Sequence, residues 1–232
     1  SYIETLVKDN QLENATHVLE EAKQRGLAGD RLIAIESNLA VLAQQTNFVR
    51  KRPPQERIES LLELYEAGQF SDAEKLASAI IQEFPNHQAA WKLLSCSLHK
   101  LERTSEALIS SLKAVEVAPL DNESHYNLGI ILAELGRLEE AEASYRQSIE
   151  LNPDYAKAHF NLGILLKEIG RLEECESSYR EAIALKPDFA EAHYNFGLAL
   201  HEMRRFDEAR TSYEQAIAFQ PNFVMAHNNL GN

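Results

Sequence analysis

The chain has 232 residues, of which 44% are hydrophobic and 25% are charged, as in soluble globular and repeat proteins. Its 36 acidic residues outnumber the 23 basic ones, which gives a formal net charge of -13. Such a surface repels phosphate groups, so we expect neither nucleic acid nor an anionic membrane as a partner. No apolar run approaches the ~20 residues of a membrane-spanning helix, and the N-terminus lacks the pattern of a signal peptide.

Residues 1–46 predict helices of weak regularity. Apolar and small residues have helical spacing in 11–22, and residues 2–9 would form a degenerate helix before them. A further amphipathic helix is expected from Asp30, at the N-cap position, to Gln45. Residues 47–54 then interrupt the pattern with three adjacent basic residues and two prolines, which predicts a linker or hinge.

From residue 54 onward the sequence repeats every 34 residues. The phrase His-Tyr-Asn-Leu-Gly at 125–129 returns as His-Phe-Asn-Leu-Gly at 159–163 and as His-Tyr-Asn-Phe-Gly at 193–197. With Asn122 as position 1, residues 224–232 begin a truncated sixth copy, and the five full copies cover 54–87, 88–121, 122–155, 156–189 and 190–223. A fixed period of this size indicates one unit stacked on copies of itself, with function on a long surface rather than in a pocket.

Each period predicts two helices. Apolar residues have helical spacing from Leu128 to Leu135, where Gly136 tolerates the left-handed conformation that ends a helix. The spacing resumes in 138–151 and stops before Pro153, which cannot continue a helix. We expect the glycine at position 8 and the small residue at position 20 to let the two helices approach, with the bulky residue at position 24 beside them. No strand-like alternation appears, so the predicted fold class is all-α.

These positions resemble the signature of the tetratricopeptide repeat (TPR) family, W-x2-L-G-x2-Y, then A-x3-F, then P. In the third copy they are Leu128-Gly129, Ala141, Tyr145 and Pro153. The resemblance extends over 54–232 and implies a right-handed superhelical solenoid of antiparallel helix pairs. Residues 1–46 look like degenerate TPR-like helices before it. The first two copies are less regular, because position 8 is Leu61 in one and Ser95 in the other.

The family resemblance implies that positions 2, 5, 6, 9, 12 and 13 line a concave groove. Position 6 carries one asparagine per repeat in four successive repeats: Asn127, Asn161, Asn195 and Asn229. An amide offers donors and an acceptor together, so this asparagine row could hold an extended peptide backbone. One hydrogen bond contributes only about 0.5–1.5 kcal/mol, so several repeats would have to act together. The row resembles that of the TPR arm of O-linked N-acetylglucosamine transferases. The alternative is a common repeat variant that caps or hydrates the groove.

Aromatic and basic side chains accompany the asparagine row. Position 5 is either a binding wall or ordinary helix packing, and its residues are Tyr126, Phe160 and Tyr194, with Lys92 one repeat earlier. Lys157 and Lys167 make the groove mixed in sign within an acidic protein. Some TPR modules clamp a C-terminal carboxylate with a cluster of Lys, Arg and Asn. The aromatic residues at position 5 match that clamp poorly.

The remaining chemistry-bearing residues favour structural roles. Equivalent residues on neighbouring helices lie about 8–10 Å apart, whereas zinc ligands lie about 2 Å from one ion. We therefore predict hydrogen-bonded core residues rather than metal ligands for the position-4 series, which is His125, His159, His193 and His227. We expect Cys175, at position 20, to be a buried substitute for alanine and Cys96 to face the groove, both as free thiols in the cytoplasm or another reducing intracellular compartment. No catalytic or metal-binding motif is present, so we expect no cofactor and no enzyme activity within this chain.

Three functions remain open at the level of sequence. The first is a protein–protein interaction scaffold that binds an extended peptide or partner segment along the concave groove. The second is the substrate-recognition arm of a larger enzyme, such as a glycosyltransferase, sulfotransferase or methyltransferase. The third is a structural assembly module. The array stops at Asn232 inside the sixth copy, so we expect further repeats or a domain downstream, or self-association through the uncapped end.

Overall fold

A computed structural model describes residue 37 and residues 53–230. The predictions for residues 1–46 and for most of the 47–54 linker therefore lie outside the described residues. Within 53–230 the chain forms helices and no strand, which confirms the all-α class. The helices are α4 (Gln55–Glu66), α5 (Phe70–Glu83), α6 (Gln88–Lys100), α7 (Thr104–Val117), α8 (Asn122–Glu134), α9 (Leu138–Leu151), α10 (Ala156–Glu168), α11 (Leu172–Leu185), α12 (Ala190–Glu202), α13 (Phe206–Phe219) and α14 (Val224–Leu230).

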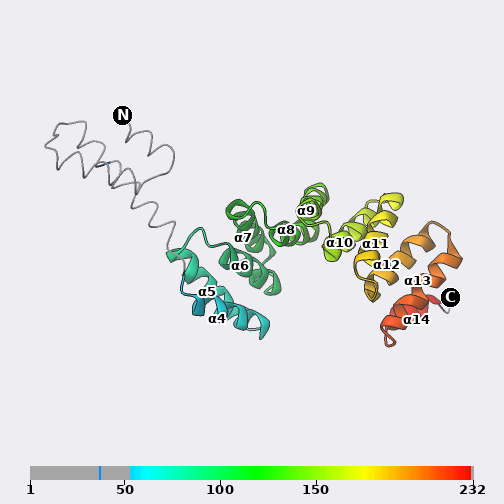
Figure 1. The fold of residues 1–232 in the computed structure, drawn as a ribbon, viewed down its shortest axis with the longest axis horizontal. Helices are drawn as coiled ribbons and strands as arrows, with labels where there is room; N and C mark the ends of the chain where they lie inside the picture. The colour runs from blue at the N-terminus through cyan, green and yellow to red at the C-terminus, as the bar shows by residue number, and fades with distance from the viewer. Residues whose placement is uncertain (1–36, 38–52, 231–232) are drawn as a thin grey trace, which may run out of the picture.

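The helices follow the 34-residue frame two at a time. Each of the five full repeats contributes a first and a second helix, from α4 and α5 to α12 and α13, and α14 opens the next copy. Each second helix packs on its own first helix and on the first helix of the following repeat. Figure 1 shows the result as a curved array, with α4 and α14 on one side and α7, α9 and α11 along the outer edge. The predicted solenoid of helix pairs is confirmed.

The turn inside each pair depends on one residue at position 15. Gly68, Gly136 and Gly170 have φ values of 73°, 71° and 77°, so the predicted glycine stop is confirmed. The same left-handed turn occurs at Glu102 and Arg204, with φ values of 60° and 61°. A side chain disfavours this conformation, so the repeat imposes its turn even where the local sequence opposes it.

The glycine at position 8 makes room for a tyrosine ring. A Cβ atom added at Gly163 would lie 2.7 Å from two ring carbons of Tyr179, the residue at position 24. The equivalent pairs are equally close, at 2.6 Å for Gly129 with Tyr145 and 2.5 Å for Gly197 with Tyr213. Real Cβ atoms do not approach ring carbons this closely, so only glycine allows the ring at this depth. The predicted close approach of the two helices is confirmed.

The first two repeats fill the same space differently. In the second repeat Ser95 and Ser111 occupy positions 8 and 24, and their hydroxyl oxygens lie 2.7 Å apart. In the first repeat Leu61 and Ala77 occupy these positions, and both are fully buried. The first repeat thus reverses the order of large and small residues seen in the regular repeats, whereas the second has a small residue at both positions. The irregular copies therefore keep the packing of the pair by changing both of its members.

Candidate functional site

The asparagine row links neighbouring first helices. The Asn161 Nδ2 atom donates to the hydroxyl of Tyr126 at 3.2 Å, from α10 to α8. The Asn229 Nδ2 atom donates to the hydroxyl of Tyr194 at 3.3 Å, from α14 to α12. In both cases position 6 of one repeat contacts position 5 of the repeat before it. Asn161 and Asn229 thus have a structural role, and the binding role of the row stays a prediction.

Two members of the row have other partners. For Asn195, the position-5 residue of the repeat before is Phe160, which has no hydroxyl. The Asn195 Nδ2 atom instead donates to the carbonyl of Glu191 in its own helix at 2.9 Å. The Asn127 Nδ2 atom donates to the Cys96 sulfur at 3.4 Å. Among the described residues none donates to the Oδ1 atom of any of the four amides. Each half-buried amide therefore donates one hydrogen bond through Nδ2, and its Oδ1 atom accepts none from a described residue.

The position-5 aromatic residues are half-buried and pack within their own repeats. The Tyr126 ring lies 5.1 Å from the Tyr155 ring, in an edge-to-face arrangement. Phe160 and Tyr194 also pack on the position-34 ring of their repeats, but at a tilt, with ring centroids 4.7 Å from Phe189 and 4.9 Å from Phe223. Each side chain keeps a partly exposed surface. Packing inside the repeat, which the sequence left as an alternative, is therefore present at all three aromatic residues.

Lys92 occupies position 5 in the second repeat and is an ion-paired residue. Its Nζ atom lies 2.6 Å from Glu123 Oε2 and 3.4 Å from Asp121 Oδ2. Asp121 is the position-34 residue of this repeat, so an ion pair replaces the aromatic pair found in the next three repeats. Asp121 also caps α8, because its side chain accepts a hydrogen bond from the Ser124 backbone N–H. The side chain of Lys92 is therefore held inside the structure rather than offered to a ligand.

The other two predicted lysines differ from each other. Lys167, at position 12, pairs with Glu202 of the next repeat at 3.6 Å. His99 and Glu134, at the equivalent positions of the second and third repeats, make the same contact at 2.7 Å. Lys157 is exposed and has no ion pair among the described residues. Of the predicted cations in the groove, Lys157 is thus the most available to an acidic ligand.

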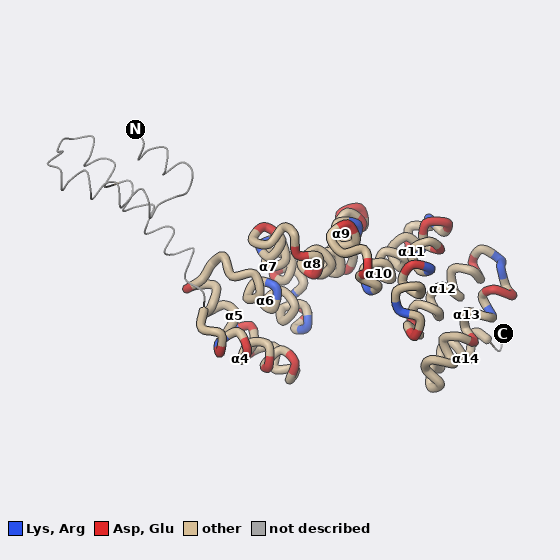
Figure 2. The backbone as a smooth tube through the Cα atoms, in the orientation of Figure 1, with Lys and Arg blue, Asp and Glu red and all other residues tan. Residues whose placement is uncertain are grey.

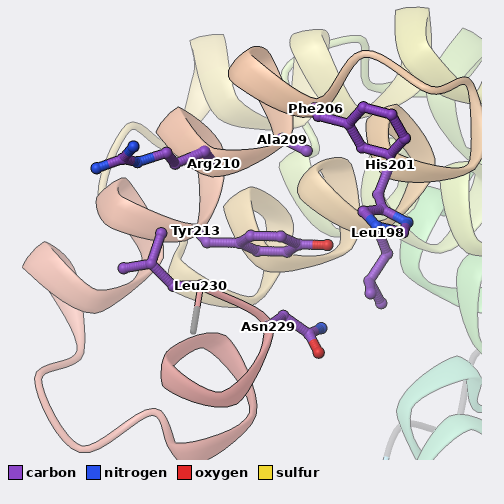
Figure 3. Close-up of a pocket in the computed structure, with 8 residues that line it drawn as sticks. All are labelled: Leu198, His201, Phe206, Ala209, Arg210, Tyr213, Asn229 and Leu230. Atoms are coloured by element: carbon purple, nitrogen blue, oxygen red, sulfur yellow. The ribbon is translucent and has the colours of Figure 1, made fainter. Parts of the chain in front are cut away.

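Hollows next to two members of the asparagine row share one set of positions. A cavity of ≈ 200 Å³ lies between the third and fourth repeats, lined in part by Ile130, Tyr145 and Asn161. A cavity of ≈ 500 Å³ follows at the α12–α14 end, lined by Leu198, His201, Phe206, Ala209, Arg210, Tyr213, Asn229 and Leu230. In Figure 3 the Tyr213 ring points into this space, whereas the Arg210 guanidinium points away from it. Each hollow combines an apolar residue at position 9, the position-24 tyrosine and the next asparagine.

The histidine series tethers each repeat to the one before it. The Nε2 atom of His159 lies 2.9 Å from the carbonyl oxygen of Pro153, and because that oxygen can only accept, the nitrogen carries the proton. The other three histidines make the same contact at 2.9–3.0 Å. Trp91, also at position 4, donates to Pro85 at 2.7 Å. The predicted hydrogen bond is confirmed. The predicted core position holds only for His193, because His125 and His159 are half-buried and His227 is exposed.

The described residues offer little reactive chemistry. They contain no group of three or more His, Cys, Asp or Glu residues that could hold a metal ion. Cys175 is fully buried, as predicted, and burial raises the pKa of its thiol to about 12. Burial also raises the pKa of Cys96. Both thiols are free and stay protonated at neutral pH. No described helix has the length and apolar character to cross a membrane.

Stacked helix pairs with a 34-residue period define an α-solenoid. Family models described as TPR repeat match residues 131–170 and 165–203, and models described as tetratricopeptide repeat match 61–119 and 190–223. These matches together cover well over half of the chain. The chain therefore belongs to the tetratricopeptide repeat proteins.

Solved structures of TPR proteins share the fold. YrrB, described as a TPR protein with an unusual peptide-binding site, is 21% identical with a TM-score of 0.64, covering 78% of this chain and 93% of YrrB. TTC0263, a thermophilic TPR protein of Thermus thermophilus, is 23% identical with a TM-score of 0.62, covering 76% of this chain and 96% of that protein. MamA of Desulfovibrio magneticus RS-1 is 15% identical with a TM-score of 0.65, covering 73% and 96%. No curated protein sequence matches the chain.

Proposed function

We propose that this chain is a non-catalytic protein-interaction scaffold that binds an extended peptide segment along its first helices. The observation that carries the proposal is the recurring hollow beside an asparagine, seen with Asn161 and again with Asn229. An apolar side chain of the peptide would enter each hollow, and a backbone N–H would donate to the free Oδ1 atom of the asparagine. YrrB, which has a similar fold, is described as having a peptide-binding site.

We expect unequal roles for the predicted site residues. Asn127, Asn161 and Asn195 would contact the peptide backbone through their carbonyl oxygens. The exposed edges of Tyr126 and Tyr194 would supply flat apolar contact at low entropic cost. Phe160 contributes in the same way between them. Because each contact is weak, affinity would depend on several repeats acting on one ligand.

Alanine substitution of the asparagine row tests this proposal. The triple variant Asn127→Ala, Asn161→Ala and Asn195→Ala should weaken peptide binding at least tenfold, measured by isothermal titration against peptides selected on the intact chain. Its circular dichroism spectrum controls for folding, because the Asn161 bond to Tyr126 is also structural. A matched control is Asn152→Ala, in the turn after α9. Unchanged affinity of the triple variant would refute the asparagine role.

The groove would serve equally in a substrate-recognition arm of a larger enzyme, so that alternative remains a prediction. Self-association through the α14 end also remains one. Val224 and Met225 of α14 are 67% and 56% exposed, and they would be the first apolar contacts of such a pairing. Light scattering across a concentration series tests it, because a strict monomer at high concentration contradicts self-association.

A further inference from the structure

The outer edge of the array carries a four-residue charged cluster where the third and fourth repeats meet. Arg171 reaches across to both carboxylate oxygens of Glu142, at 2.8 and 2.9 Å, and pairs with Glu174 in its own helix. Arg146 lies 2.8 Å from Glu142 and 3.1 Å from Glu174. Every charge in the cluster thus has two opposite neighbours. In Figure 2 acidic and basic residues accordingly gather on α9 and α11.

The same cluster recurs one junction later, between the fourth and fifth repeats. Its members are Glu176, Arg180, Arg205 and Glu208, which occupy the same four positions of the frame. Arg205 contacts Glu176 at 2.5 Å, and Arg180 contacts it at 2.8 Å. Between the first and second repeats three of the four charges are present, and Arg103 contacts Glu74 at 2.7 Å. The pairing between positions 16 and 21 therefore crosses three of the four junctions.

The junction between the second and third repeats breaks this rule. Leu108 and Leu112 stand at the two α7 positions that carry Glu142 and Arg146 one repeat later. Arg137 keeps its own partner Glu140, at 2.6–2.7 Å through Nε and Nη2. Its Nη1 atom, which would meet the missing carboxylate, has no partner among the described residues.

The apolar substitutions extend beyond the cluster positions. Ile109, beside Leu108, is 64% exposed, and Leu112 is 49% exposed. The residues equivalent to Ile109 in the other full repeats are Lys75, Ala143, Ser177 and Thr211. Leu108 is half-buried and packs on the core, but Ile109 and Leu112 gain no such cover. We call Leu108, Ile109 and Leu112 the leucine patch.

We propose that the leucine patch and Arg137 form a second docking surface, which binds an amphipathic helix of a partner protein. Leu112 lies one turn from both Leu108 and Ile109 on α7, so the three form a ridge that a second helix can pack against. Apolar residues on the partner helix would cover Ile109 and Leu112. An Asp or Glu beside them would take the place that Glu142 has beside Arg171. The required partner is therefore an acidic amphipathic helix, not a basic one.

This surface is separate from the peptide groove. It lies on a second helix, at the outer edge of the array, whereas the asparagine row lies on first helices (Figure 1). One chain could then hold two partner segments at once. The proposal does not depend on the function of the groove, so a variant in one site should leave the other unchanged.

The test uses a designed helical peptide as the probe. A labelled peptide of about 18 residues carries leucines one turn apart on one face with flanking glutamates, and a matched peptide carries lysines in place of the glutamates. Fluorescence anisotropy measures binding of both to the 232-residue chain. The key variant is Leu108→Glu with Leu112→Arg, because it installs the charged cluster that the next junction already has. It should therefore fold, and circular dichroism checks that.

Four results are expected. The acidic peptide binds the wild-type chain at least tenfold more tightly than the basic one. The double variant weakens the acidic peptide at least tenfold, and Arg137→Ala removes the preference between the two peptides. Asn161→Ala, in the groove, leaves both affinities unchanged. Binding of the acidic peptide that is equal in the double variant, or absent at about 1 mM protein, overturns the proposal.

Discussion

The close approach of Gly163 to Tyr179 predicts that Gly163→Ser destabilises the wild-type chain but not a chain in which Tyr179 is replaced by serine. In the wild-type chain, the Cβ atom of a serine at position 163 would lie 2.7 Å from two ring carbons of Tyr179. The Tyr179 ring cannot retreat, because the residue is fully buried. We therefore expect Gly163→Ser to destabilise the fourth repeat. In a Tyr179→Ser background the obstacle is absent, and the same substitution should be neutral or stabilising.

The magnitudes are large enough to measure. Overpacking a well-filled site lowers the free energy of unfolding by about 1–3 kcal/mol. The higher helix propensity of serine over glycine offsets up to about 0.5 kcal/mol of this loss. Tyr179→Ser alone should cost about 3–5 kcal/mol, as for other large-to-small aromatic substitutions. In the double variant the two hydroxyls can form the bond that Ser95 and Ser111 already make at 2.7 Å. The double-mutant cycle should give a favourable coupling free energy of about 1–3 kcal/mol.

Local measurement suits this experiment, because repeat arrays can unfold in parts. Hydrogen exchange of α10 and α11, read by mass spectrometry, reports the stability of the altered pair in all four chains of the cycle. Ala184→Ser, on the exposed side of α11, controls for adding a hydroxyl to the helix. If Gly163→Ser destabilises both backgrounds equally, the ring does not select the glycine and the packing explanation fails.

Three further predictions concern single contacts. His159→Phe should lower stability by about 0.5–1.5 kcal/mol in thermal melts, because it loses the bond to the proline carbonyl, whereas His159→Trp should retain it. Phe160→Tyr should raise stability by a similar amount by offering Asn195 a hydroxyl; an unchanged melting temperature would argue against the Tyr–Asn bond as a stabilising contact. Hydrogen bonds from Arg171 lower the pKa of Glu174, so their stabilisation is present above the pKa of an unfolded glutamate and is lost as pH falls through the folded value. Melting temperatures measured as the pH is lowered through the carboxylate range should therefore fall less steeply in Arg171→Gln than in wild type.

The repeat architecture was predictable because its signals are local. A helix ends at Gly136 for reasons contained in the residue itself, and apolar spacing is visible within one helix. The 34-residue period then supplies the long-range information, since equivalent residues must meet equivalent neighbours. Helix boundaries, pair order and the role of the position-8 glycine follow from these signals alone.

The partners of the site residues were less predictable because they depend on a second repeat. The Asn195 side chain turns to its own helix because residue 160 is Phe rather than Tyr. Lys92 looks like a free cation in the groove until Asp121 and Glu123 are brought beside it. A comparison of positions 5 and 34 across repeats could have found this second case, because both change together.

In the irregular repeats, residues that contact each other are exchanged in pairs. Positions 8 and 24 change from Gly–Tyr to Ser–Ser, and positions 5 and 34 change from two rings to a lysine and an aspartate. In each case both members changed, so the two serine hydroxyls bond to each other and the lysine has a carboxylate partner. At the leucine patch the α7 members of the charged cluster changed, but Arg137 did not. An arginine that stays in place after its cross-repeat carboxylate is lost is what we expect where the missing carboxylate belongs to another molecule.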